Sequence, residues 1–434
     1  MDIDQIIKSN YFKSKVNFLN KIVFDKDYNS QKLQFKKLKF ILKIASTKIP
    51  FYKDYFYKNH LDLNDFKTVN DLCYLPIINK SFINDNYKNF LRVDVQYESL
   101  FSRTTGGSTG EPLKVIYDYN FKLRDLANTF FYTGIAGHIP RSEASLRVYG
   151  DVIDLYEYDY NILKISIYDL SFTKVQLINK EIVKHRPKYI HGRPSAVIHL
   201  IETFLKLDIK FPLSIKTVFL DGEVLSFSQK QAVEKFFNCK VFVTYGHTEG
   251  SLLGYSCINS DNIHFHPNVG IVELIENKEE NQTNNLKKVI TTGLNNLVFP
   301  LIRYDTNDLA VKYDSFCECS QNSLQIKEII GRVQDLVYSK NGSKLCLTPF
   351  FFNYNLIDWR GVERFQYIQE KKGLIKLKLV PNKNYKNFET YFLKLKETIL
   401  TNFPEGFEIN FEIVDKINRT KRGKYKYFIQ KIDE

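Results

Sequence analysis

Residues 104–112 (TTGGSTGEP) consist mostly of glycine and hydroxyl side chains and stand directly before the strand-like run 113–117. Glycine lets a backbone come close to a ligand, and hydroxyl and free N–H groups can surround phosphate oxygens. The segment lacks the Gly-Lys-Ser/Thr ending of a Walker A loop. The sequence therefore predicts a phosphate-binding loop of another fold, with a plain turn as the alternative.

Residues 241–250 (VFVTYGHTEG) are typical of a buried strand that runs into a polar turn. A carboxylate and a hydroxyl at the end of a strand can hold Mg²⁺ and a phosphate or carboxyl oxygen. Tyr245 can stack on a purine. The alternative is a helix N-terminus, where Thr248 would be the cap and Glu249 would favour the helix dipole.

Three further segments carry weaker signals on their own. They are residues 221–223 (DGE), residues 300–309 (PLIRYDTNDL) with 331–335 (GRVQD), and residues 418–426 (NRTKRGKYK). Acidic side chains suit the two hydroxyls of a ribose and arginine suits phosphate, although a surface ion-pair network would use the same residues. By composition alone, the last segment indicates a nucleic-acid or anionic-membrane patch.

The elements that must position these segments alternate in type along the chain. Helical spacing of apolar residues predicts amphipathic helices in the first 60 residues. Short strand-like runs then alternate with helical stretches, which predicts an α/β sheet with ligands at its strand ends. A β-rich part follows, with an Asn-Gly hairpin at 341–342. The runs 374–380, 388–400 and 407–414 predict a small α+β domain at the end.

Length and composition narrow the class of protein. The chain has 434 residues, of which 44% are hydrophobic and 26% charged, so a globular protein of two or three domains is expected. The net charge is +13, and residues 336–434 hold 19 Lys and Arg against 11 Asp and Glu. This excess fits nucleic acid, a membrane surface or an anionic nucleotide. Without a signal peptide, a membrane-spanning run or paired cysteines, a reducing cytoplasm is the expected location.

In their order and spacing, these segments resemble the adenylate-forming ligases, and within them the branch of phenylacetate-CoA ligases and capsular-polysaccharide-associated relatives. Residues 50–54 (PFYKD), 75–80 (LPIINK) and 192–195 (GRPS) resemble further signatures of that branch. The resemblance implies an α/β fold with a large N-terminal domain of mixed sheets and helices over residues 1–335. It also implies a small, mobile C-terminal α+β domain over residues 336–434.

The same resemblance implies residue roles. The implied ATP site comprises Ser108, Thr109, Gly110, Gly222, Glu223, Tyr245, Gly246, Asp308 and Arg332. Thr248 and Glu249 would lie at the reacting phosphate, with Glu249 as the Mg²⁺ ligand. Lys424 would reach the forming adenylate from the small domain, and Asp335 would be the hinge. Asn307 departs from the glycine of the common Thr-Gly-Asp motif.

Four residues could bind a second metal. The branch often carries Cys and His where this chain has Cys257, His264, Cys317 and Cys319. Three thiolates and one imidazole would complete a tetrahedral, structural Zn²⁺ site. His266 competes with His264 for this role, and free thiols are the alternative.

Three functions remain open on the sequence. The first is an acyl-CoA synthetase that uses ATP, Mg²⁺ and CoA on a small organic acid. The second is an amide- or ester-forming ligase of surface-polysaccharide or secondary metabolism, and the third is a non-catalytic basic binder of polyanions. We expect a small-molecule carboxylic acid and an acyl acceptor as partners, no nucleic acid and no membrane span, in a monomer or homodimer. Polar candidates near the acid are His138, Tyr149, Asp151, His191 and Arg193.

Overall fold

The computed structural model describes most of the chain. It covers residues 3–105, 112–149, 154–167, 170–225, 227–276, 286–313, 317–319, 321, 323–332, 336–341, 344–346, 357–382, 385–403, 406–418 and 427–432. The chain forms two compact units. The first comprises Met1–Ser142, Phe242–Glu276 and Asn285–Ile329, and the second comprises Glu143–Val241 and Ile330–Glu434. Among the described residues, no helix has the length and apolar character needed to cross a membrane.

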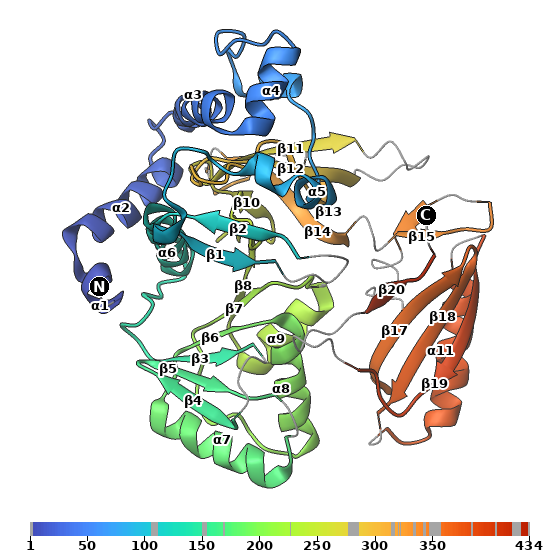
Figure 1. Ribbon diagram of the computed structural model, residues 1–434. Coiled ribbons are helices and arrows are strands. Elements are labelled where there is room, and N and C mark those ends of the chain that lie inside the picture. Colours follow the sequence, from blue (N-terminus) through green and yellow to red (C-terminus); the bar gives the residue numbers. More distant parts are fainter. Residues whose placement is uncertain are drawn as a thin grey trace. The chain divides into compact units, whose positions relative to one another are not determined.

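Helices form the N-terminal part of the first unit, as predicted (Figure 1). They are α1 (Ile3–Lys8), α2 (Asn10–Phe24), α3 (Ser30–Lys48), α4 (Pro50–Lys58) and α5 (Lys80–Asp85), with 3₁₀ turns η1 (Val69–Tyr74), η2 (Tyr87–Phe90) and η3 (Tyr97–Ser99). The side chains of Ser9 and Asn29 cap α2 and α3 by accepting backbone N–H bonds. One face of α3 is apolar, and Leu38, Ile41 and Leu42 are fully buried in the core.

Mostly antiparallel strands make up the rest of the first unit. They are β8 (Lys240–Tyr245), which joins this unit at Phe242, then β9 (Gly254–Ser256), β10 (Ile263–Phe265), β11 (Gly270–Glu276), β12 (Leu286–Gly293), β13 (Tyr304–Lys312) and β14 (Gln325–Arg332). Their order is β11-β12-β13-β14-β10-β9-β8. A hairpin of β1 (Phe101–Thr104) and β2 (Lys114–Tyr117) leads into α6 (Tyr119–Ile135). This order makes β13 an inner strand, flanked by β12 and β14.

The first part of the second unit contains the predicted strand–helix alternation. Its strands are β3 (Ser145–Val148), β4 (Tyr156–Asp159), β5 (Ile162–Ile165), β6 (Tyr189–Gly192) and β7 (Thr217–Asp221), in the order β7-β6-β3-β5-β4. All pairs are parallel except β4 with β5. The helices are α7 (Phe172–His185), α8 (Pro194–Lys206) and α9 (Phe227–Phe237). Loops that follow β6 and β7 therefore leave from the same edge of this sheet.

The C-terminal part is α+β, as predicted. A short hairpin of β15 (Leu336–Tyr338) and β16 (Lys344–Cys346) precedes β17 (Val362–Lys371), β18 (Leu374–Pro381), α11 (Phe388–Asn402), β19 (Glu408–Ile413) and β20 (Phe428–Gln430). The sheet order is β19-β18-β17-β20. Trp359 stacks on Phe365 at 4.2 Å between ring centroids, inside a core of its own. The domain boundary at residue 335 and the mobility of this part remain predictions.

Candidate active site

The end of β8 and the middle of β13 bring two of the sequence motifs into contact. The hydroxyl of Tyr245 donates a 2.7 Å hydrogen bond to Oδ2 of Asp308. Asn307, which precedes Asp308 within β13, has φ of +59° and lies at an irregularity in the pairing of β13 with β12. This left-handed conformation favours glycine and tolerates asparagine, so Asn307 can occupy the position where related motifs carry glycine.

Glu249 follows in the turn after β8 and makes a second contact with β13. Its Oε1 accepts a 2.8 Å hydrogen bond from the hydroxyl of Tyr304, and its Oε2 lies 2.9 Å from Nδ1 of His247. Burial acts to raise the pKa of Glu249, but His247 and Tyr304 outweigh it and hold the pKa at about 2. The carboxylate is therefore ionised and placed to bind a cation.

The alternative of a helix N-terminus at Thr248 is wrong. Residues 246–253 form turns and bends, and the next regular element is the strand β9. Gly246, at the beginning of this turn, is exposed, and a Cβ there would meet no atom within 4 Å. The turn thus leaves Gly246 accessible to a ligand, while Thr248 and Glu249 are less exposed.

Gly250 closes the same turn and packs against Arg103, in the strand β1 that precedes the glycine-rich segment, and against Phe121 in α6. It has φ of +67°, and a Cβ at this position would overlap the guanidinium of Arg103 and the ring of Phe121. Arg103 is held by a 2.7 Å ion pair with Asp125 and lies over the ring of Phe121. Only glycine fits here without a shift of Arg103 or Phe121.

The described ends of the predicted phosphate loop are paired. Thr105 donates its backbone N–H to the carbonyl of Leu113 at 2.9 Å, and its Oγ1 accepts the N–H of Leu113 at 2.8 Å. Residues 106–111, and with them Ser108, Thr109 and Gly110, lie outside the described residues. Asp151, Asp335 and Lys424 also lie outside them, and for Arg332 only the backbone, at the end of β14, is described.

Gly222 and Glu223 belong to the second unit and follow β7. The carboxylate of Glu223 accepts the backbone N–H of Ser195 at 2.9 Å and the hydroxyl of Ser195 at 3.1 Å. Ser195 lies in the first turn of α8, which has no side-chain bond from its own N-cap residue. The carboxylate of Glu223 therefore caps a helix, a contact that the sequence did not indicate.

The polar candidates for the acid pocket occupy different elements. His138 is buried after α6, and Tyr149 donates a 2.7 Å hydrogen bond to Asp221. His191 lies in β6 with its ring stacked 4.7 Å from that of Phe219, and Arg193 precedes α8. His138 belongs to the first unit, and Tyr149, His191 and Arg193 belong to the second.

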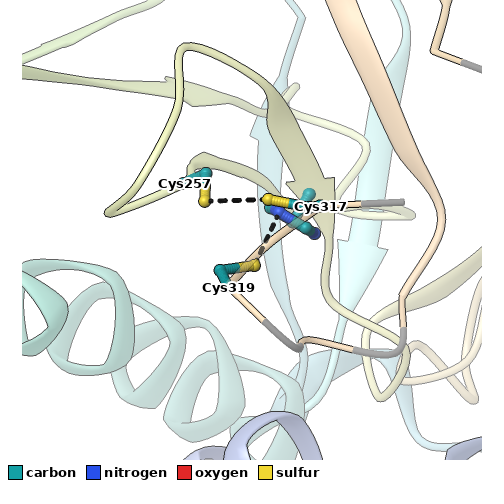
Figure 2. A group of neighbouring side chains, drawn as sticks. Cys257, Cys317 and Cys319 are labelled. Atoms are coloured by element: carbon teal, nitrogen blue, oxygen red, sulfur yellow. Dashed lines mark hydrogen bonds between the residues drawn. The ribbon is translucent and has the colours of Figure 1, made fainter. Parts of the chain in front are cut away.

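The predicted cysteine and histidine ligands converge in the first unit. The ligand atoms of Cys257, His264, Cys317 and Cys319 all lie within 4.8 Å of one another. Figure 2 shows the three cysteine side chains around one centre. The Cys257 and Cys317 sulfurs are 3.4 Å apart, and Nε2 of His264 is 3.4 Å from the Cys319 sulfur. The separations fit a tetrahedral ion with Zn–S and Zn–N bonds of about 2.3 and 2.0 Å.

The surroundings of His264 fit a metal ligand better than those of its competitor. Nδ1 of His264 lies 3.1 Å from the hydroxyl of Ser323, which leaves Nε2 facing the thiols. Burial lowers the pKa of His264 to about 4, so the ring is neutral, as a metal ligand requires. His266 instead accepts the N–H of Asn268 and packs edge-on against Phe131.

Several residues of the site were missed by the sequence interpretation. Tyr304 and His247 lie inside recognised motifs, yet neither was given a role. Their position next to Asp308 and Glu249 in the sequence was the available signal. Arg103 carried no signal, because its contact with Gly250 joins segments far apart in the chain.

The chain has relatives of known name. The family model of the CapK C-terminal domain matches residues 337–431. Protein CapK of Staphylococcus aureus is 24% identical over 400 residues, which cover 88% of this chain and 85% of that protein. Phenylacetate-coenzyme A ligase of Thermus thermophilus is 23% identical over 327 residues, covering 70% and 71%.

A solved structure has the same fold. The crystal structure of 2-hydroxyisobutyryl-CoA ligase in the postadenylation state superposes with a TM-score of 0.71 at 15% identity, covering 92% of this chain and 89% of that one. Shared folds at such low identity do not define a substrate. Together with the order of the motifs, the two curated relatives support the resemblance to the adenylate-forming ligases, and the solved structure shows the shared fold.

Proposed function

We propose that the chain, an AMP-forming ligase by its family, activates a small organic acid and transfers the acyl group to CoA. In the first step a carboxylate oxygen of the acid attacks the α-phosphorus of ATP. The bond from this phosphorus to the bridging oxygen breaks, and pyrophosphate leaves with the electron pair. In the second step the CoA thiol attacks the acyl carbon of the adenylate, loses its proton and releases AMP.

The observation that supports this proposal most is the double contact between the β8 and β13 motifs. Tyr245 bonds to Asp308, and Tyr304 bonds to Glu249. One contact offers an aromatic ring beside a carboxylate, which suits a purine and the hydroxyls of its ribose. The other offers an ionised carboxylate, which suits Mg²⁺ on the phosphates.

The remaining chain supplies charge and enclosure in this proposal. Mg²⁺ held by Glu249 would neutralise charge on the phosphate oxygens. Lys424 would stabilise negative charge that gathers at the α-phosphate during displacement. Ser108 and Thr109 would bind the β- and γ-phosphates. The small domain that carries Lys424 would begin after residue 335. It would rotate about Asp335 between the adenylation step and the transfer step, so that it could serve both half-reactions.

CoA is the proposed acceptor because a curated relative and a structural neighbour are named as CoA ligases. An amine or a sugar hydroxyl is the second candidate. It is kept because Protein CapK and the family model that matches residues 337–431 are not named as CoA ligases.

A pyrophosphate-exchange screen over a panel of carboxylic acids tests the activation step. We expect label to enter ATP only with suitable acids and with Mg²⁺. Lys424→Ala should abolish exchange while leaving ATP affinity nearly intact. Absence of exchange with every acid, together with salt-dependent polyanion binding, would overturn the proposed function in favour of a basic binder.

The acceptor is then identified with the best acid. AMP release that depends on CoA would support the thioester-forming reaction. Release that depends instead on an amine or sugar, with no response to CoA, would show the second candidate to be correct.

We also propose that Cys257, His264, Cys317 and Cys319 bind one structural Zn²⁺. With four protein ligands, no coordination position remains for a substrate. The ion would crosslink residues 317–319 to β10 and to the segment after β9. This crosslink would stabilise the sheet that contains β8 and β13.

A further inference from the structure

Glu249 is held at both of its oxygens by side chains of its own unit. Tyr304 donates to Oε1 at 2.8 Å, and Nδ1 of His247 lies 2.9 Å from Oε2. The side chain of Glu249 is only 10% exposed, and that of His247 is 14% exposed. The carboxylate thus cannot turn without breaking a hydrogen bond in a largely buried place.

The hydrogen-bond pattern defines which nitrogen of His247 carries the proton. An ionised carboxylate only accepts hydrogen bonds, so Nδ1 must donate to Glu249. Nε2 lies 3.2 Å from the hydroxyl of Ser251, which is also in close contact with the hydroxyl of Thr291. Ser251 and Thr291 are both buried, so both ring nitrogens of His247 have a fixed neighbour: Glu249 at Nδ1 and Ser251 at Nε2.

The position of Tyr304 is fixed by hydrogen bonds of the two residues next to it in the chain. Ile78 donates its N–H to the carbonyl of Arg303, and Asp305 donates its N–H to the carbonyl of Ile78 at 2.8 Å. The guanidinium of Arg303 bonds to Glu273 and to the carbonyl of Leu75. The N-terminal segment 75–80 therefore fixes the backbone on both sides of Tyr304, a residue that is only 3% exposed.

A carboxylate offers about four lone-pair positions, and Tyr304 and His247 use one on each oxygen. The backbone of Glu249 also interacts with the carboxylate, so a cation would bind at a position that these groups do not use. We propose that Tyr304 and His247 are positioning residues that hold the Glu249 carboxylate in one orientation, ready to bind the Mg²⁺ of ATP. This inference rests on the proposed function, because that function makes Glu249 the Mg²⁺ ligand.

The expected size of the effect comes from the behaviour of other metal sites. Side chains that bond to a metal ligand typically contribute about 10- to 100-fold to metal affinity or activity. Loss of the Tyr304 hydroxyl should therefore raise the Mg²⁺ concentration needed for half-maximal ATP binding by about tenfold or more. ATP binding without Mg²⁺ should not change, because neither residue is proposed to contact the nucleotide.

The test is calorimetric ATP binding across a series of Mg²⁺ concentrations, with the full chain and no acid. The variants are Tyr304→Phe, His247→Leu and His247→Asn. We expect Tyr304→Phe and His247→Leu to shift the Mg²⁺ midpoint upward. His247→Asn should restore most of the loss, because the asparagine amide can donate near the position of Nδ1.

A matched control separates positioning from stability. Tyr52 is also a buried tyrosine of the first unit, and its hydroxyl accepts the N–H of Ile302 at 3.1 Å. Tyr52→Phe should lower the melting temperature while leaving the Mg²⁺ midpoint unchanged.

Two outcomes would overturn the inference in different ways. Midpoints for Tyr304→Phe and His247→Leu equal to that of the wild type would reject the positioning role and leave the proposed function intact. Failure of the folded wild-type chain to bind ATP at any Mg²⁺ concentration would reject the proposed function and the inference together. If Tyr304→Phe does not fold, the positioning role is tested by the Mg²⁺ midpoints of the two His247 variants. A higher midpoint for His247→Leu than for His247→Asn would support the role, and equal midpoints would reject it.

Discussion

The hydroxyl of Tyr245 donates a 2.7 Å hydrogen bond to Oδ2 of Asp308. The bond fixes the carboxylate proposed to receive the ribose hydroxyls next to the ring proposed to stack on adenine. Tyr245→Phe keeps the ring and removes the bond, so we expect ATP affinity to fall by about tenfold, or about 1.4 kcal/mol. Asp308→Ala should weaken it further, as measured by calorimetry.

Tyr255→Phe provides the control for Tyr245→Phe. Tyr255 lies in the neighbouring strand β9, and its hydroxyl donates to Gln321 at 2.8 Å. Its loss should reduce stability but leave ATP affinity unchanged. Equal ATP affinities for Tyr245→Phe and the wild type would contradict the proposed role of the Tyr245–Asp308 pair.

Gly250→Ala should be strongly destabilising, because it combines backbone strain with overlap against Arg103 and Phe121. Gly137→Ala is the matched control, since Gly137 also has positive φ but open space around it. We expect about 1 kcal/mol for Gly137→Ala and a further 1–3 kcal/mol, approximately, for Gly250→Ala. Denaturant unfolding measures both. A similar decrease in the free energy of unfolding for the two variants would mean that Arg103 and Phe121 can move aside without destabilising the fold.

Glu223→Ala should cost about 1–2 kcal/mol of stability, because it removes both hydrogen bonds to Ser195 at the start of α8. Asn29→Ala is a comparable loss of a cap, at α3, and is expected to affect stability alone. The two variants differ if Glu223 also lines the nucleotide pocket. In that case only Glu223→Ala lowers ATP affinity, and an unchanged affinity would limit Glu223 to capping.

Fold and site differ in how far the sequence could predict them. The strand and turn at residues 241–250 follow from local signals, namely a β-branched and aromatic run that ends in glycine and polar residues. The cap on α8 does not, because Glu223 and Ser195 are 28 positions apart and either is an ordinary turn residue alone. Likewise, the contact of Tyr304 with Glu249 spans 55 positions and exists only once β13 has its place in the sheet.

For the cysteine cluster, too, the sequence predicts only part of the arrangement. Spacing suggested the four ligands, but it could not choose between His264 and His266, which lie two residues apart in the sequence. The choice depends on side-chain environment. His264 faces the sulfur of Cys319, whereas His266 is enclosed by Phe131 and the Asn268 backbone.

Metal analysis of the purified chain should find about one zinc per molecule, the number that a single four-ligand site binds. His264→Asn should lose this zinc and lower the melting temperature, because the ligand set is incomplete. His266→Asn should keep the zinc, and so should Cys73→Ser, which changes an exposed thiol. Zinc lost with His266→Asn but retained with His264→Asn would reverse the assignment, and its absence from the wild type would remove the site.

Lys37 predicts an unusual pH dependence of stability. Its ammonium bonds to the backbone and side-chain oxygens of Asn268 and to the side chain of Asn295. None of these partners is an anion. Burial, together with the charges of Arg124 and Lys15, lowers the pKa of Lys37 to about 7. The nearby His266 adds no charge at neutral pH, because burial lowers its pKa to about 3.

The sign of the effect follows from the protons bound in each state. Between pH 7 and 9 the unfolded chain keeps Lys37 protonated, since an unperturbed lysine has a pKa near 10.4, whereas the folded chain releases the proton. The unfolded state then binds more protons, so this group makes stability rise with pH. Relative to Lys37→Met, the wild type should gain up to about 2 kcal/mol between pH 7 and 9, and nothing between pH 5 and 6. Urea unfolding of both proteins at these pH values measures the gain, and a constant difference from pH 5 to 9 would show that Lys37 stays charged in the fold.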